Sequence, residues 1–226
     1  VPVGSRSALG LGLGMALAGT PVVVELDATA SLDASVLRDA VRAQGFSPTL
    51  VIRVGAGGQA GPLDAAFDVP GLSVWASSAS NADQVLAHAL KGGVHLILES
   101  RTDYGRRTEP AGLQPVVEHR PGRHATVATW GAGVRAALEA AETLASEGID
   151  AGVLELVQLS PLPETLVQAV TGTGRLVVVH PGDPERAEVV QRRVLQGAFL
   201  YLESPLARCA GRPEAVIEAV RESVHY

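Results

Sequence analysis

Short runs of aliphatic and β-branched residues alternate along the chain with longer segments in which apolar residues recur at helical spacing. The short runs predict strands at Pro21–Leu26, Thr49–Val54, Leu72–Ser77, His95–Glu99, Ala125–Trp130, Ala151–Val157, Leu176–His180 and Pro205–Cys209. The longer segments predict helices at Ser5–Ala18, Leu32–Gln44, Asn81–Lys91, Gly133–Glu147, Pro163–Val170, Asp183–Gln196 and Pro213–Ser223. This alternation of strands and helices is typical of α/β proteins.

Two of the predicted strands are apolar at successive positions, Val22–Val24 and Leu176–Val179. A strand that is apolar on both sides is covered on both faces, as in a parallel sheet between two layers of helices. The segment Gly105–Arg123 interrupts the pattern with three prolines and three glycines. We therefore predict an α/β fold with mainly parallel sheets flanked by helices, in two domains (residues 1–104 and 125–226) joined by a linker over residues 105–124.

Composition narrows the classes of function. Hydrophobic residues make up 46% of the chain but aromatic residues only 4%, so the core is expected to consist of Val, Leu and Ala. The formal net charge of −6 disfavours binding to nucleic acid or to anionic membranes. A single cysteine, Cys209, excludes an internal disulfide and a cysteine-based zinc site and fits a cytoplasmic protein. The apolar segment Leu9–Ala18 is too short to span a membrane.

Two glycine-rich segments were considered as ligand loops. The first, Gly10–Gly14, has no strand before it and lies inside a predicted helix, which favours close packing of that helix over phosphate binding. The second, Gly55–Gly61, directly follows a predicted strand, where α/β proteins often bind ligands. This loop is either a ligand-binding loop or a flexible connector.

Several ionisable residues are candidates for catalysis. His180 ends the most apolar predicted strand, where it is either a general base or a hydrogen-bonded strand-end residue. His88 is expected to face solvent on its helix. Three carboxylates lie at or near strand ends: Glu25, Asp27 and Glu99. They are either acids or bases with shifted pKa values, or they cap helices or pair with arginines. No pair of histidines has the spacing of a metal site.

Several segments, in the correct order, resemble the beta subunit of the thiamine-diphosphate-dependent 2-oxo acid dehydrogenase first component, of the pyruvate and branched-chain type. They cover most of residues 1–211. The matching segments are Gly10–Gly19 with Val22–Leu26, Leu50–Arg53, Pro70–Val74, His95–Glu99, Thr126–Ala141, Gly148–Leu162, Gly172–His180 and Ala198–Gly211.

The resemblance implies a transketolase-like pyrimidine-binding domain followed by a transketolase C-terminal domain. In that family, thiamine diphosphate lies between subunits, where an alpha subunit holds the diphosphate with magnesium and the beta subunit holds the aminopyrimidine. A glutamate of the beta subunit bonds the pyrimidine ring and promotes formation of the reactive ylid. A partner alpha-like subunit, or self-association, is therefore expected.

The positions that match these cofactor contacts are Val3, Ser5, Asp27 and Ser31, and most of them are substituted. Ser5 stands at the position of the catalytic glutamate, and a serine hydroxyl is a far weaker base than a carboxylate near neutral pH. Val3 keeps the apolar character of its family counterpart. Asp27 and Ser31, with Ala28, replace a glutamine and aromatic contacts.

Further family features are reduced. The loop Gly57–Pro62 has no histidine where the family has a His-Ser-Gln loop, and the turn after His180 is shortened to Pro181–Pro184. We therefore assign no catalytic residue and no metal ligand to this chain. The chain also starts at Val1, without methionine, where the glutamate motif is expected, which raises the possibility of a truncated or processed fragment.

Three functional hypotheses follow. The chain is a beta-subunit-like component of a thiamine-diphosphate-dependent 2-oxo acid dehydrogenase (an oxidoreductase) or related decarboxylase that lacks the catalytic glutamate. Alternatively, it is a non-catalytic homologue, a pseudoenzyme that assembles with an alpha-like subunit or with itself and binds no cofactor. The third hypothesis, a nucleotide-binding module that uses the loop Gly55–Gly61, ranks last.

Overall fold

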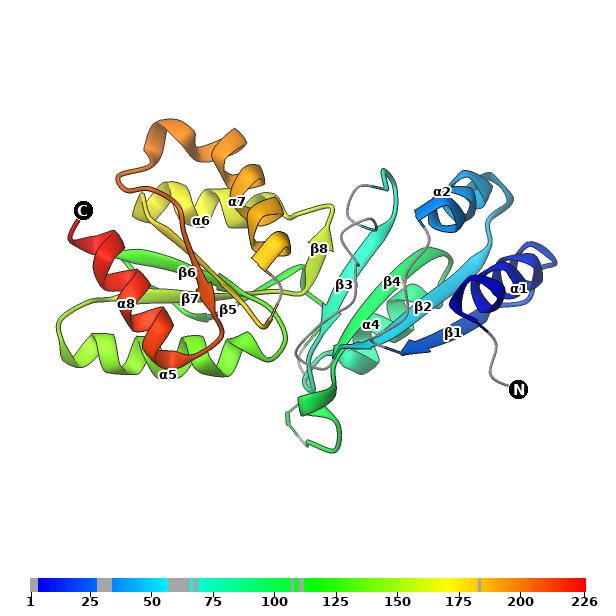
Figure 1. Cartoon of the computed structure of the whole chain (residues 1–226), viewed down its shortest axis with the longest axis horizontal. Helices are drawn as coiled ribbons and strands as arrows, with labels where there is room; N and C mark the ends of the chain where they lie inside the picture. The colour runs from blue at the N-terminus through cyan, green and yellow to red at the C-terminus, as the bar shows by residue number, and fades with distance from the viewer. Residues whose placement is uncertain are drawn as a thin grey trace. The chain divides into compact units, whose positions relative to one another are not determined.

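The computed structural model describes residues 4–27, 34–56, 66, 69–106, 108–109, 112–182 and 184–226. The chain forms two compact units, of which the first comprises Val1–Leu113 with Gln158–Pro161 and the second Gln114–Val157 with Leu162–Tyr226. Each unit contains a five-stranded, mostly parallel sheet with helices packed on it (Figure 1). The predicted α/β class with mainly parallel sheets is confirmed.

The first unit has a sheet in the order β1-β2-β4-β3-β8, in which only β8 is antiparallel to its neighbour. Its elements are α1 (Ser5–Leu17), β1 (Val22–Asp27), α2 (Ala34–Arg42), η1 (Ala43–Phe46), β2 (Thr49–Ala56), β3 (Ser73–Ser77), α4 (Ala82–Ala89), β4 (Gly93–Ser100), η2 (Arg101–Asp103) and β8 (Gln158–Ser160).

Helices α1 and α4 lie on opposite faces of this sheet. The position of a Cβ at Gly12 of α1 lies beside Val24 of β1, and the strand register places Val24 in one row with Ile52, Leu96 and Val74. Because side chains alternate along a strand, Trp75 of β3 points to the other face. There it meets His88 of α4, so that helices cover both faces, as the continuously apolar strands predicted.

The glycines of α1 have different surroundings. A Cβ at Gly12 would lie 2.5 Å from a methyl carbon of Val24, whereas a Cβ at Gly10 or Gly14 would have no neighbour within 4 Å. Gly12 therefore allows α1 to approach the sheet closely. This agrees with the interpretation of the glycine-rich segment as a packing helix, because α1 precedes β1 and no strand of the described residues leads into it.

The second unit has a sheet in the order β10-β9-β6-β7-β5, in which only β5 is antiparallel. Its elements are β5 (Val116–Arg120), β6 (Ala125–Thr129), α5 (Gly133–Ser146), β7 (Ala151–Leu156), α6 (Glu164–Thr173), β9 (Leu176–His180), α7 (Pro184–Ala198), η3 (Phe199–Tyr201), β10 (Ala207–Ala210) and α8 (Pro213–Val224).

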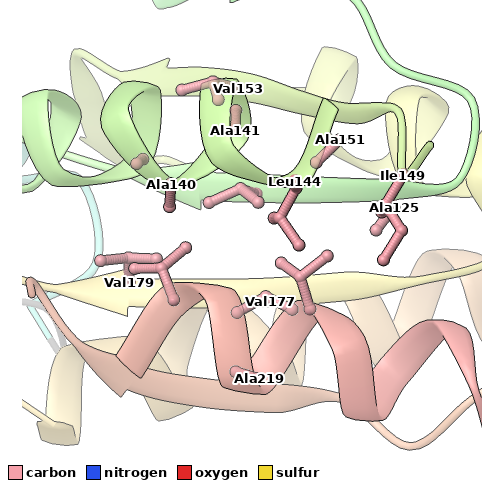
Figure 2. Packing of buried hydrophobic residues seen from close by; sticks show 14 residues of the cluster. Ala125, Ala140, Ala141, Leu144, Ile149, Ala151, Val153, Val177, Val179 and Ala219 are labelled. Carbon is pink, nitrogen blue, oxygen red and sulfur yellow. The ribbon is translucent and has the colours of Figure 1, made fainter. Parts of the chain in front are cut away.

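The core of the second unit is made of small aliphatic side chains (Figure 2). Helix α5 contributes Ala137, Ala140 and Leu144 to this core. The same cluster contains Val177 of the sheet and side chains of α8. Alanines on the inner face of α5 let the helix approach the strands closely, so valines and alanines fill the space without aromatic rings. The core composition expected from the sequence is found here.

Two short strands were not predicted. Strand β5 lies within residues 105–124 and pairs antiparallel with β7, so this segment contributes to the second sheet instead of serving only as a connection. Strand β8 follows β7 directly but pairs antiparallel with β3 of the first sheet. Both strands are edge strands with only three or five residues, too short for a clear apolar period.

The contrast between Gly12 and Gly14 yields a matched pair of variants. Gly14→Ala adds a methyl group in open space and should stabilise the first unit by up to about 1 kcal/mol through helix propensity. Gly12→Ala forces α1 away from Val24 and should be less stable than Gly14→Ala by about 1–3 kcal/mol, the usual cost of overpacking. Urea unfolding in a Trp130→Phe background, followed by the fluorescence of Trp75, measures both. Equal stability of the two variants would contradict the close packing of α1.

Candidate functional site

The most extensive polar cluster in the first unit surrounds Arg53 of β2. Its Nε and Nη2 atoms donate to the two carboxylate oxygens of Glu99 on β4 at 2.8 and 3.0 Å, and its Nη1 atom donates to Glu25 on β1 at 2.5 Å. The Glu99 side chain is 11% exposed and that of Glu25 71%. Arg53 thus joins three neighbouring strands through one buried and one exposed carboxylate.

Strand register explains how these residues meet. Glu25 of β1 pairs in register with Arg53 of β2, while Glu99 of β4 pairs with Gly55, two residues beyond Arg53. Residues two apart on a strand share a face, so all three side chains project on the same side of the sheet, toward its carboxyl end. The carboxyl end of a parallel sheet is the usual ligand-binding edge of α/β proteins.

Tyr104 extends the cluster. Its hydroxyl donates to Glu99 at 2.7 Å, and burial, followed by this hydrogen bond, raises the pKa of Tyr104 above its ordinary value. A Cβ at Gly55 would lie 3.2 Å from both the Tyr104 hydroxyl and the Nε atom of Arg101. The missing side chain at Gly55 therefore leaves room for two polar side chains over the end of β2.

The chemistry of the cluster is that of a structural clamp. The bond to Glu99 raises the pKa of Arg53, so Arg53 stays cationic and donates to both carboxylates. Arg53 holds Glu99 through both carboxylate oxygens and the exposed Glu25 through one. Of the two interpretations left open for these carboxylates, the pairing with arginine is the one found. Asp27 ends β1, but its side chain lies outside the described residues.

Sequence reasoning did not single out Arg53 or Tyr104 as members of a site. A signal was nevertheless present, because Arg53 interrupts the apolar run Leu50–Val54 of a strand covered on both faces. A charge in such a strand requires a partner of opposite sign, and the two flanking strands carry Glu25, Asp27 and Glu99.

Most positions that match cofactor contacts lie outside the described residues. Ser5 is the first residue of α1 and is half-buried, and the first turn of this helix has no acidic residue. Val3, Ala28, Ser31 and the loop 57–62 lie outside the described residues. The assignment of Val3, Ser5, Asp27 and Ser31 to cofactor contacts therefore stays a prediction.

The second unit has a separate polar pair on its edge strand. The Nε2 atom of His119 lies 2.7 Å from a carboxylate oxygen of Glu155, whose side chain is 2% exposed. The register between β5 and β7 shifts between Glu118 and Arg120, so His119 occupies a β-bulge. A bulge redirects a side chain, and here it directs the imidazole onto a buried carboxylate of β7. Neither residue was predicted as a partner of the other.

Two further candidate residues of the second unit are His180 and Cys209. His180 ends β9 as predicted and is half-buried. Burial raises the pKa of Cys209 to about 11, so its thiol is protonated and unreactive near neutral pH.

Metal and membrane sites were also considered. Across the described ranges, no three or more His, Cys, Asp or Glu side chains come together as ligands for a metal ion. No helix in the described part of the chain is both long and apolar enough to cross a bilayer.

Comparison with known proteins relates the chain to one family. Residues 115–224 match the family "Transketolase, C-terminal domain". A pyruvate dehydrogenase E1 component subunit beta from Rhizobium meliloti is 33% identical over 156 residues, which are 64% of this chain and 34% of that protein. The mitochondrial subunit beta-1 of Arabidopsis thaliana is 31% identical over 243 residues, covering 93% of this chain and 66% of that protein. The matched region is thus only about a third of the Rhizobium protein.

A solved structure shares the fold. The chain superposes on a protein described as "Split gene transketolase, inactive beta4 tetramer" with a TM-score of 0.75, over 99% of this chain and 82% of that one. The sequence identity is 16%, so this similarity concerns the fold alone.

The clamp around Arg53 predicts a specific pattern of stabilities. Arg53→Leu leaves Glu99 buried without a cation and should destabilise the first unit by about 2–3 kcal/mol, below the range for fully buried pairs because the Arg53 side chain is 29% exposed. The double variant Arg53→Leu/Glu99→Leu should recover most of this loss. Glu25→Gln, at an exposed carboxylate, should cost less than about 1 kcal/mol. Urea denaturation followed by Trp75 fluorescence in a Trp130→Phe background measures all three, and a double variant no more stable than Arg53→Leu would contradict the clamp.

Proposed function

We propose that this chain is a beta-subunit-like component of a thiamine-diphosphate-dependent 2-oxo acid dehydrogenase or a related decarboxylase. The proposal starts from two findings: the chain carries a transketolase C-terminal domain, and it is a distant homologue of pyruvate dehydrogenase E1 beta subunits. The observation that carries the proposal is the match to E1 beta subunits along 93% of the chain. The two α/β units support it, because they are what a beta subunit contributes to an assembly.

We further propose that this chain does not itself provide the catalytic base. Ser5 stands where the family has a glutamate, and its hydroxyl does not accept a proton readily near neutral pH. Glu25 and Glu99, the described carboxylates at the ends of β1 and β4, are held by Arg53. A working site would therefore need a base from another chain, and the role of this chain would be to position its partner.

The second candidate is a non-catalytic homologue that assembles with an alpha-like subunit or with itself. Two observations favour it: the hydroxyl at Ser5, and the fold shared with a protein described as an inactive beta tetramer. In this case, the chain keeps the shape needed for assembly and binds no thiamine diphosphate. Both candidates predict a stable oligomer, and they differ in the cofactor.

Native mass spectrometry of the complex isolated from the natural host, with thiamine diphosphate quantified per assembly, separates the two candidates. We expect a hetero-oligomer with an alpha-like subunit. Stoichiometric cofactor in it would support the first candidate, and an oligomer without cofactor would support the second. A chain that is recovered only as a monomer, without cofactor, would contradict both.

A substitution at Ser5 tests the missing base. If the complex binds the cofactor, Ser5→Glu should raise its turnover of a 2-oxo acid by about 100-fold, the usual contribution of a general acid or base. Ser7→Glu, which adds the same charge at an exposed position of α1, should leave turnover unchanged. Equal turnover by the unmodified complex and the Ser5→Glu variant would contradict the prediction that the base is missing at position 5.

A further inference from the structure

One cluster of aromatic and imidazole rings lies outside the site described above. The indole Nε1–H of Trp75 on β3 donates to the Nδ1 atom of His95 on β4 at 3.2 Å. The His88 ring, on α4, packs edge-on against both, with ring centroids 5.2 Å from Trp75 and 5.7 Å from His95. Trp75 is 4% and His95 8% exposed. His88, which was expected to face solvent, is half-buried in this cluster, because α4 turns it toward the sheet.

The hydrogen bonds define the protonation of His95. An indole N–H can only donate, so the Nδ1 atom of His95 must accept and carries no proton. The Nε2 atom lies 2.9 Å from the carbonyl oxygen of Gly92, which can only accept, so Nε2 carries the proton. His95 is therefore neutral, with both ring nitrogens in use.

The turn before β4 is built around this imidazole. Gly92 and Gly93 have φ angles of +136° and +96°, values that side-chain-bearing residues rarely adopt. A Cβ at Gly93 would lie 3.2 Å from the Nε2 atom of His95. The two glycines thus bring the Gly92 carbonyl onto the ring and connect the end of α4 to the strand.

We propose that Trp75, His88 and His95 form a proton-sensitive latch that holds α4 and the Gly92–Gly93 turn on the first sheet. The latch is closed while His95 is neutral. A proton on Nδ1 removes the acceptor of the Trp75 indole. The N–H groups of Trp75 and His95 then face each other in a buried position without an acceptor between them. The Nε2 atom is already bonded to the Gly92 carbonyl. A rotation of the imidazole ring by 180° therefore cannot restore hydrogen bonds to both Trp75 and Gly92, and the contact between α4, β3 and β4 opens. This device goes beyond the function proposed above and does not depend on it.

The groups around His95 determine that protonation opens the latch. The titratable group turned toward it from α4 is His88, and a positive charge there would repel one on His95. The neighbouring strands pair with it at Val51 of β2 and Ser73 of β3 and, with Trp75, contribute no charge. No carboxylate among the described residues bonds to this imidazole to stabilise its charged form, so protonation is met only by unfavourable contacts.

The effect of pH on stability follows from these contacts. Burial lowers the pKa of His95 below its ordinary value of 6.5 and outweighs the hydrogen bond to Gly92, which raises this pKa; the repulsion from His88 lowers it by a smaller amount. The unfolded chain then binds this proton more tightly than the folded one. The contribution of the latch to the free energy of unfolding is therefore complete above about pH 6.5 and falls as the pH decreases toward the lowered pKa.

The experiment uses the full chain with Trp130→Phe, which leaves Trp75 as the only tryptophan. Nuclear magnetic resonance from pH 8 to pH 4.5 follows the Trp75 indole N–H and the imidazole nitrogens of His95. We expect protection of the indole proton from solvent exchange to fall at least tenfold at the pH where His95 titrates. Exchange of the α4 amides should increase at the same pH, while far-UV circular dichroism stays unchanged.

Two variants sharpen the test. His95→Gln offers a side-chain oxygen to Trp75 and an amide N–H to Gly92 without a titratable group, so the indole should stay protected throughout. His88→Gln removes the repelling charge and should move the midpoint to higher pH. An indole proton that stays protected while His95 titrates would overturn the latch. Loss of the circular dichroism signal at the same midpoint would also overturn it, since the first unit would then unfold as a whole.

Discussion

The first sheet depends on one electrostatic constraint, the guanidinium of Arg53 in a strand that is covered on both faces. Such a charge is tolerated only when carboxylates compensate it, and Glu25 and Glu99 do so from the two neighbouring strands. The bidentate bond to Glu99 fixes the register of β2 against β4, because a shift by one residue would turn the two side chains to opposite faces. The ligand-binding edge of this sheet is thereby occupied by a structural ion network.

Other buried polar groups of the chain are also paired with protein partners. His95 is buried as a neutral ring between Trp75 and the Gly92 carbonyl, and Glu155 is buried against His119. In each case, a group that is able to do acid–base chemistry makes hydrogen bonds that hold neighbouring elements together.

This distribution bears on function. Family membership rests on the transketolase C-terminal domain and on similarity along the chain, and both concern the scaffold. A shared fold does not by itself carry a shared activity. The proposal of an assembling subunit without its own base combines this similarity with the prediction that Ser5 stands where the family has a carboxyl group.

The sequence by itself determined the fold class and most of the elements, because strands covered on both faces leave continuous apolar runs such as Leu176–Val179 and helices leave a different period. The order of the family segments also led to the prediction that Ser5 is a substituted position, and this stays a prediction. Glu25 and Glu99 were recognised as strand-end carboxylates, but their common partner Arg53 was not.

Only the tertiary structure decided which polar groups meet. Arg53 and Glu99 are 46 residues apart, and His119 and Glu155 36, so that no local pattern connects them. The strands β5 and β8 were missed for a related reason, because each is short and its pairing comes from a distant strand. His88 was assigned to solvent because a helix pattern alone does not show that Trp75 and His95 fill the space beneath it. Local periodicity determines elements, whereas contacts between residues distant in the sequence determine the polar clusters.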